Sequence, residues 1–341
     1  MLIRSKAPLR LGLAGGGTDV SPYSDRFGGG ILNATINLFA HATIEPVADG
    51  MVRFETEDGN LKKAFPSGPE IKPEGLFDIH AGIYNRIMKD FPAYNLSFKL
   101  VTSVDAPQQS GLGTSSTLAV AILGAFVEWL KLPLGEYDIA HLAYEIERTD
   151  LGMAGGKQDQ YSATFGGINF MEFYKDKVIV NPLKIKDSCI EELSHNLVLY
   201  YTDTSRMSSQ IIARQQQNVL NDDSIAIEAM HQLKKQALMM KEALLRGNLD
   251  EIGKILDFGW KYKKQMAQGI TNANLDTIYD TAIENGATGG KISGAGGGGY
   301  MFFYCPGNSR YKVIESLKQF GGYTERYEFT SEGLVTWTLE Q

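Results

Sequence analysis

Glycine is concentrated in four separate loops of this chain, and this distribution constrains the fold more than any other feature of the sequence. More than half of the 37 glycines fall in residues 12–30, 111–113, 152–167 and 286–299. Each of these ranges adjoins an apolar segment that is typical of a strand or a helix, whereas a flexible linker would mix glycine with serine or proline in one stretch. Glycine loops let the backbone approach a ligand closely. The sequence therefore predicts that the four loops converge on one site.

Length and charge narrow the class of protein. The 341 residues predict two domains or one large α/β domain, because a single core stops growing near about 250–300 residues. The net charge is -7 and no basic run is present, so we expect neither a nucleic-acid nor a membrane partner. The apolar run at 117–127 is shorter than the roughly 18 residues of a membrane span, and no export signal is visible. Cys189 and Cys305 lack the spacing of a metal site. We expect a cytoplasmic protein.

The hydrophobic pattern predicts a β-rich first half and a helix-rich second half. In the first half we expect strands at residues 1–14, 31–47, 51–56, 95–104 and, as a pair, within 168–180, and helices near 77–90, 115–130 and 136–150. In the second half we expect strands at 197–202, 300–304 and 323–339, and helices near 207–220, 225–246, 249–268, 274–285 and 309–319. The segment at 57–75 is expected to be turn-rich. The change in pattern places a domain boundary near residues 185–195 and predicts domains at 1–190 and 191–341.

The second glycine loop has the chemistry of a phosphate site. Two glycines precede three consecutive hydroxyl residues, and a strongly apolar helix follows directly. The free N–H groups and the positive end of the dipole at a helix N-terminus favour anions. An ordinary N-cap explains one hydroxyl, but it explains three in a row less well. No Walker-type sequence is present, which disfavours a Walker-type NTPase. The predicted ATP-phosphate-binding residues are Gly111, Leu112, Gly113, Thr114, Ser115 and Ser116.

Residues 107–116 resemble the second signature of the GHMP kinases, a family that includes galactokinase, homoserine kinase and mevalonate kinase. Residues 7–19 and 291–299 are similar to the first and third signatures and occur in the family's order. The resemblance implies a two-domain α+β fold, in which a domain like ribosomal protein S5 domain 2 precedes a ferredoxin-like domain. It also implies a kinase that uses ATP and Mg²⁺ as cofactors, with the nucleotide between the domains.

The resemblance implies roles for single residues as well. Asp159 takes the position of the catalytic aspartate, and Arg10 that of the basic residue beside it. Without the flanking motifs, this pair would be interpreted as a structural ion pair. Ser115 and Glu147 match the Mg²⁺ ligands of the family, with Glu145 as an alternative to Glu147. Whether Asp159 removes a proton or only orients the hydroxyl stays open.

The first glycine turn narrows the expected substrate to sugars. Its Gly-Gly-Gly-Thr-Asp sequence resembles that of the D-glycero-D-manno-heptose 7-phosphate kinases and, more distantly, that of the kinase half of fucokinases. Both resemblances imply phosphorylation of the anomeric hydroxyl. For Asp19, the alternative to binding sugar is a local role in an Asx turn. The predicted substrate-binding residues of the glycine loops are Gly16, Gly17, Thr18, Asp19, Gly294 and Gly296.

A later segment, residues 202–210, predicts a site for a second phosphate. Arg206 and Ser208 offer a guanidinium and a hydroxyl where a strand leads into a helix. An N-cap with one surface arginine is the alternative. The heptose-phosphate kinases carry a similar run, so we predict a kinase of D-glycero-D-manno-heptose 7-phosphate, as a monomer or homodimer. The alternatives are a kinase of a free sugar such as L-fucose and a non-catalytic sensor of sugar or nucleotide.

Overall fold

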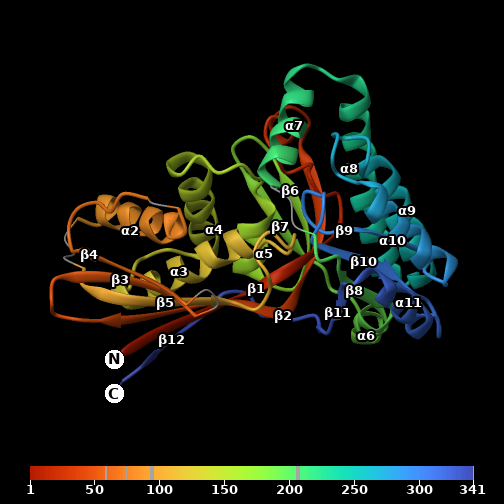
Figure 1. The fold of residues 1–341 in the computed structure, drawn as a ribbon. Helices are drawn as coiled ribbons and strands as arrows, with labels where there is room; N and C mark the ends of the chain where they lie inside the picture. Colours follow the sequence, from red (N-terminus) through yellow and green to blue (C-terminus); the bar gives the residue numbers. More distant parts are fainter. Residues whose placement is uncertain (58–59, 74, 93–95, 205–207, 341) are drawn as a thin grey trace.

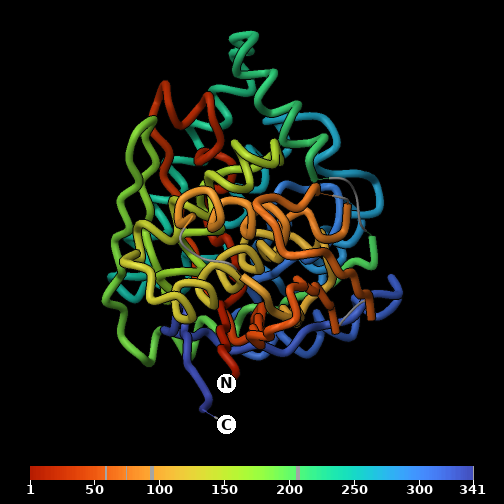
Figure 2. Tube along the Cα trace, turned by 90° about the vertical axis from the view of Figure 1, so that its left-hand side faces the viewer, coloured from red at the N-terminus to blue at the C-terminus, as the bar shows by residue number. Residues whose placement is uncertain are grey.

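The protein is described by a computed structural model for residues 1–57, 60–73, 75–92, 96–204 and 208–340. The protein has two β-sheets, helices pack on both (Figure 1), and buried side chains from the two sheets meet in one hydrophobic cluster. The first and last strands are antiparallel neighbours, so the two termini lie close together in both views of the backbone (Figure 1, Figure 2). The predicted α+β class is confirmed.

The larger sheet has eight strands. Six follow the order β12-β1-β2-β5-β3-β4, and β6 and β7 continue from β2. The long strand β2 pairs with three strands: β1, β6 through residues 29–34, and β5 through residues 40–46. The strands are β1 (Leu2–Ala14), β2 (Gly29–Pro46), β3 (Met51–Thr56), β4 (Leu61–Pro66), β5 (Phe98–Val104), β6 (Ile168–Phe173), β7 (Val178–Pro182) and β12 (Val335–Leu339).

The smaller sheet is antiparallel and has the order β11-β8-β10-β9. Its strands are β8 (Leu197–Tyr201), β9 (Gly289–Ile292), β10 (Tyr300–Tyr304) and β11 (Tyr323–Glu325). All residues of β8 and β10 are buried. The predicted domains at 1–190 and 191–341 stay a prediction, and β12 crosses that division because it pairs with β1 in the larger sheet.

The helices of the two halves of the chain form two groups (Figure 1), except that the short helix at Tyr23–Phe27 packs among those of the second half. Those in the first half are α1 (Tyr23–Phe27), α2 (Asp78–Asp90), α3 (Thr114–Leu130), α4 (Glu136–Glu145), the π-helical turn η1 (Ile146–Asp150) and α5 (Gln158–Phe165). Those in the second half are α6 (Asp187–Asn196), α7 (Ser208–Leu220), α8 (Ser224–Arg246), η2 (Leu249–Glu251), α9 (Ile252–Lys263), α10 (Ala273–Glu284), α11 (Arg310–Leu317) and η3 (Lys318–Phe320).

Helix α3 is the central helix of the first half. It is apolar on most faces, and its residues 119–126 are buried against β1, β2, α2 and α5. A helix that is apolar all round is stable in water only inside a core. This burial fixes the direction of α3 and thereby the place of its N-terminus, where the predicted phosphate loop ends.

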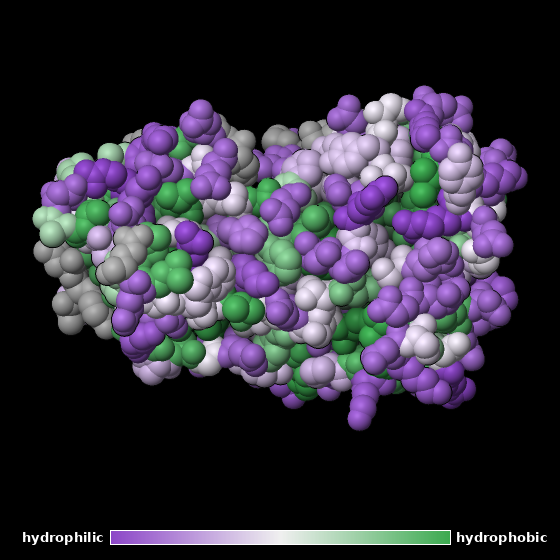
Figure 3. Space-filling view, turned by 90° about the horizontal axis from the view of Figure 1, so that it is seen from below, coloured by the Kyte–Doolittle hydropathy of each residue, from purple (hydrophilic) through white to green (hydrophobic). Residues whose placement is uncertain are grey.

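Among the described residues, no helix combines the length and the apolar character needed to cross a membrane. Figure 3 shows one outer face of the molecule, on which hydrophilic side chains surround small separate hydrophobic areas. Single exposed apolar side chains of this kind are normal on proteins.

Candidate active site

The four glycine loops converge on one cavity, as the sequence predicts. The cavity has a volume of about 1060 Å³ and is lined by residues from every one of the loops. These lining glycines are Gly17, Gly111, Gly113, Gly152, Gly155, Gly156 and Gly294. The N-terminus of α3, the start of α5, and helices α7 and α9 also contribute to its wall.

Arg10 and Asp159 form a salt bridge in the wall of this cavity. Both Nε and Nη2 of the guanidinium contact Asp159 Oδ1, at 2.7 and 2.6 Å. Arg10 is buried in β1, and its Nη1 also donates to the carbonyl of Gly111 at 2.6 Å. Asp159 keeps part of its side chain exposed at the start of α5. The arginine therefore holds a carboxylate that still faces the cavity, beside the phosphate loop.

The phosphate loop ends in a glycine that the geometry requires. Gly113 has a φ of +81°, a conformation that L side chains rarely adopt, and a Cβ there would lie 3.1 Å from Asp159 Cγ. Gly113 is the N-cap of α3, so no side chain occupies the first free N–H groups of that helix. Thr114, Ser115 and Ser116 line the cavity at this point. The free N–H groups at the start of α3 therefore form a candidate anion site next to Asp159.

Glu147 lies beside Ser115, whereas Glu145 points elsewhere. The hydroxyl of Ser115 donates to Glu147 Oε1 at 3.3 Å, and the amide of Gln160 donates to Glu147 Oε2. Glu145 instead accepts from Arg86 at 2.7 Å. Residues two apart on a helix are about 200° apart around its axis, so the two carboxylates face different sides. Of the two alternatives left by the sequence, the structure brings Glu147 to the predicted serine.

The donor set at Ser115 and Glu147 suits Mg²⁺. Mg²⁺ is usually held by one or two carboxylates together with substrate phosphates and waters, not by a cage of protein ligands. Glu147 is fully buried and its carboxylate faces a hydroxyl at the edge of the phosphate loop. Within the described part of the chain, no cluster of three or more His, Cys, Asp or Glu side chains could hold a metal. The pair can hold this ion only where a phosphate completes the ligand set.

Asp19 lies at the same end of the cavity as the catalytic candidates. Its Oδ2 accepts from the backbone N–H of Gln158 at 3.0 Å, one residue before Asp159. Burial raises the pKa of Asp19, and the charge of Asp159 raises it further, while the Gln158 hydrogen bond opposes the shift. A Cβ on Gly156 would lie 1.9 Å from Asp19 Oδ2, so only glycine lets the two loops meet here.

Several predicted residues make contacts inside the protein. The hydroxyl of Thr18 is buried and donates to the carbonyl of Gly15 at 2.8 Å. Leu112 packs in the core, and its carbonyl accepts from the N–H of Arg10 at 3.2 Å. Gly296 approaches the backbone of Ile270. Their contacts support the site loops, and their direct role in binding stays a prediction.

Two of the predicted residues from the second half of the chain line the cavity. Ser208 begins α7 and lines the cavity, as does Gly294, which lies against Gly111. Arg206 lies outside the described residues. Of the two side chains predicted to hold the second phosphate, the structure therefore describes Ser208.

The sequence analysis missed two buried lysines beside the first glycine turn. Lys263, near the end of α9, donates to the carbonyl of Gly16 at 3.0 Å, and Lys291, in β9, donates to that of Gly12 at 2.5 Å. Burial lowers the pKa of Lys263 to about 8, with Arg10 adding to the shift and Asp19 opposing it. The pKa of Lys291 also falls well below its usual range because of burial and of the charges of Lys263 and Arg10. Lys263 lines the cavity.

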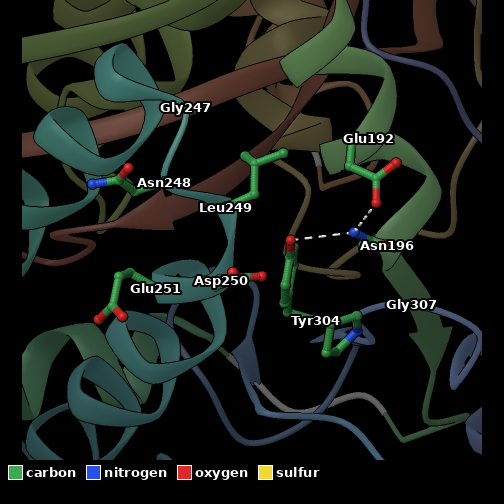
Figure 4. Close-up of a pocket in the computed structure, with 10 residues that line it drawn as sticks. Glu192, Asn196, Gly247, Asn248, Leu249, Asp250, Glu251, Tyr304 and Gly307 are labelled. Atoms are coloured by element: carbon green, nitrogen blue, oxygen red, sulfur yellow. Dashed lines mark hydrogen bonds between the residues drawn. The ribbon is translucent and has the colours of Figure 1, made fainter.

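A second cavity, of about 510 Å³, lies away from these residues (Figure 4). Three acidic side chains line it, together with Asn196 and Tyr304. The amide of Asn196 donates to Glu192 at 2.8 Å and to the hydroxyl of Tyr304 at 3.2 Å. None of the residues that the sequence singled out contributes to it, so the larger cavity is the candidate active site.

Comparisons with known proteins agree with this geometry. Residues 78–167 match the family profile described as "GHMP kinases N terminal domain", and residues 240–322 match "GHMP kinases C terminal". The chain is 48% identical over 338 residues to the D-glycero-alpha-D-manno-heptose 7-phosphate kinase of Campylobacter jejuni, covering 99% of both chains. It is 25% identical over 326 residues to the L-fucokinase/L-fucose-1-P guanylyltransferase of Bacteroides fragilis, covering 88% of this chain and 34% of that one.

Solved structures are similar over the same extent. A crystal structure described as a D-glycero-D-manno-heptose 1-phosphate kinase from Bacteroides thetaiotaomicron has a TM-score of 0.85 and 44% identity to this chain. The similarity covers 99% of this chain and 100% of that one. The fold that the three signatures implied is therefore confirmed.

Proposed function

The chain belongs to the GHMP kinase family, and we propose that it transfers the γ-phosphoryl group of ATP to the anomeric hydroxyl of D-glycero-D-manno-heptose 7-phosphate. The observation that carries this proposal is the 48% identity, over almost the whole chain, to a kinase named for that substrate. The product would be the 1,7-bisphosphate, for nucleotide-activated heptose synthesis. The cytoplasmic location and the monomeric or homodimeric state stay predictions.

In this proposal the residues of the cavity position the two substrates. Phosphoryl transfer through a loose transition state needs alignment and charge stabilisation more than covalent chemistry. The N–H groups at the start of α3 would bind the ATP phosphates, and Arg10 would add positive charge beside them. Asp159, held by Arg10 and facing the cavity, would accept a hydrogen bond from the anomeric hydroxyl and orient its oxygen toward the phosphorus.

Ser115 and Glu147 would hold Mg²⁺ against the ATP phosphates. The bound ion would neutralise charge that develops on the phosphate oxygens. Gln160 and Ser115 both donate to the carboxylate of Glu147 and so fix its direction before ligands bind. Such prearrangement lowers the cost of ordering the site when the nucleotide arrives.

One part of the cavity wall suits the adenine ring. It is lined by Leu76, Ile79, Val104 and Leu118 from α2, β5, α3 and the segment before α2. His80 also lines it, and its Nε2 shares a hydrogen bond with the hydroxyl of Thr102 at 3.0 Å. Nucleotide pockets combine apolar walls with a few polar groups in this way. The sugar would then bind in the part of the cavity near Asp19.

We expect the purified protein to prefer heptose 7-phosphate to an unphosphorylated sugar. The fucokinase relative makes L-fucose the main alternative substrate, and the name of the B. thetaiotaomicron protein makes heptose 1-phosphate a second one. The test is kcat/KM for D-glycero-D-manno-heptose 7-phosphate, for the 1-phosphate and for L-fucose, with NMR of each product. A higher kcat/KM for either alternative would contradict the proposed substrate, and phosphorylation of no sugar would favour the sensor.

The variant Arg206→Ala is expected to raise the KM for the sugar phosphate with little change in the KM for ATP. The reason is that one charge-assisted hydrogen bond to a phosphate contributes about 1.5–3 kcal/mol, which corresponds to roughly 10- to 150-fold in affinity. Steady-state kinetics with both substrates varied would measure it. Ser208→Ala is the companion variant, with a smaller increase expected for a neutral hydroxyl. An unchanged KM for the sugar phosphate in both variants would remove the segment from the phosphate site.

A further inference from the structure

The sugar end of the cavity contains buried polar atoms that the protein itself does not satisfy. Asp19 Oδ1 and Gln215 Nε2 have no hydrogen-bond partner within the part of the chain that the structure describes, although both side chains are at least 98% buried. Lys263 is equally buried, and its ammonium group, which carries three donors, donates to the carbonyl of Gly16. All three side chains line the cavity. An unmade hydrogen bond at a buried atom costs free energy, so such groups together indicate a ligand.

These groups surround one point of the first glycine turn. A Cβ built on Gly17 would lie 3.6 Å from Lys263 Nζ and 3.5 Å from Gln215 Oε1. Gln215 comes from α7 and Lys263 from α9, so two helices of the second half bring their side chains to a loop of the first half. Asp19 follows Gly17 by two residues and contributes to the electrostatic environment of Lys263.

The combination of groups distinguishes a hydroxyl from a phosphate. A sugar hydroxyl both donates and accepts hydrogen bonds, and this subsite offers an acceptor, Asp19 Oδ1, beside two donors, Gln215 Nε2 and Lys263 Nζ. A phosphate is an acceptor only and would be repelled by the carboxylate of Asp19. The hydrogen-bonding pattern therefore fits adjacent hydroxyls on a sugar ring, and a phosphate of the same substrate must lie elsewhere.

We infer that Lys263 and Gln215, together with Asp19, bind the ring hydroxyls of the sugar, and that Lys263 determines which sugar the enzyme accepts. The inference rests on the proposed sugar-kinase function. Sites that are built to hydrogen-bond a hydroxyl reject analogues without it strongly, because their buried polar groups are then left unpaired. The buried polar atoms that indicate this subsite would therefore also make it select between sugars.

The main test replaces Lys263 with methionine, which keeps the length of the side chain and removes its donors. We expect Lys263→Met to weaken sugar binding by about 10- to 100-fold, as for other hydrogen bonds to charged groups, with ATP binding unchanged. Calorimetry with the sugar phosphate alone and KM values for both substrates would measure it. The matched control is Lys261→Met on the same helix, whose exposed side chain pairs with Asp257 at 2.7 Å. Its sugar binding should stay at the wild-type value.

Deoxy-sugar analogues separate direct contact from support of the glycine turn. If Lys263 contacts a hydroxyl, the analogue without that hydroxyl should bind wild type and Lys263→Met almost equally, while the other analogues keep the difference. An equal loss for every analogue would mean that Lys263 only supports Gly16 and would overturn the inference. Gln215→Leu provides the same comparison at a second residue, so the inference can still be tested if Lys263→Met does not fold.

The pH dependence gives an independent readout. The groups that face Lys263 are Asp19, Arg10 and Lys291. Since burial lowers the pKa of Lys263 to about 8, its ammonium form is lost above that pH, and the wild-type KM for the sugar should rise there. In Lys263→Met the KM should be high at every pH from 7 to 9, and a rise like that of wild type would contradict the inference. The choice of substrate is tested separately, because the same variants are compared on whichever sugar the wild type turns over best.

Discussion

The variant Asp159→Asn is expected to reduce kcat by about 10²- to 10⁴-fold, which is the usual contribution of a positioned acid or base. Asparagine keeps the size of the side chain and can still accept from Arg10, but it removes the negative charge that faces the cavity. The groups proposed to bind the nucleotide are backbone N–H groups and hydroxyls at the start of α3, not this carboxylate, so ATP binding should stay near the wild-type value. Single-turnover kinetics and calorimetry with ATP would measure the two quantities.

Loss of the carboxylate also changes the folded protein, and this effect must be separated from catalysis. Arg10 is 3% exposed and would keep only neutral partners, which destabilises the fold when a buried pair is broken. We therefore expect a lower Tm together with retained ATP binding. The control is Asp150→Asn, whose carboxylate pairs with Arg86 at 3.1 Å away from the lining of the cavity. Turnover of Asp159→Asn within a factor of ten of wild type would exclude the assigned role.

Elements with a continuous hydrophobic pattern were predicted well from the sequence. The strands β3 and β10 match the expected residues 51–56 and 300–304, and α3 begins one residue before the expected helix. β10 and α3 are continuous apolar runs, and β3 alternates buried and partly exposed residues, and both patterns are typical of the elements that form. Burial follows directly from that pattern, so the local sequence was sufficient to predict where these elements begin and end.

The missed elements have other causes. Strand β4 falls in a segment that was expected to be turn-rich, because its LKKAFP sequence is charged and mostly exposed at the edge of the sheet. Strand β9 has the sequence GGKI, in which glycine and lysine are typical of loops. A Cβ on its Gly289 would lie 1.8 Å from the carbonyl oxygen of Gly253 in α9, so tertiary packing requires glycine here and keeps the strand buried. No local pattern reports such a contact.

The predicted site was incomplete in the same way. The glycine loops, Asp159 and Glu147 could be located because motifs mark them, whereas Lys263 stands in no motif. Its burial depends on the packing of α9, and lysine is almost never fully buried without a partner. A signal was nevertheless present: Leu256, Gly259 and Lys263 share the buried face of α9 at helical spacing. A lysine in register with an apolar face could have been predicted as a buried cation.

The variant Glu147→Gln is expected to raise the Mg²⁺ concentration needed for half-maximal activity by at least about 10- to 100-fold, because even residues that only support metal ligands have effects of that size. Glutamine fills the same fully buried space, but its single carbonyl oxygen can accept from Ser115 or from Gln160, not from both as the two carboxylate oxygens do. The change therefore removes the charge and one of the two acceptors. Calorimetry of ATP binding with and without Mg²⁺ gives a readout that is independent of turnover.

The matched control is Glu145→Gln, which distinguishes the two carboxylates that the sequence left as alternatives. Glu145 pairs with Arg86 and with His141, and its side chain is 36% exposed. Exposed pairs of this kind contribute about 0–1 kcal/mol, so the control should keep the Mg²⁺ dependence of wild type. A shifted Mg²⁺ dependence in Glu145→Gln together with an unchanged one in Glu147→Gln would reverse the assignment. It would also mean that the π-helical turn η1, which carries Glu147 to Ser115, has a structural role only.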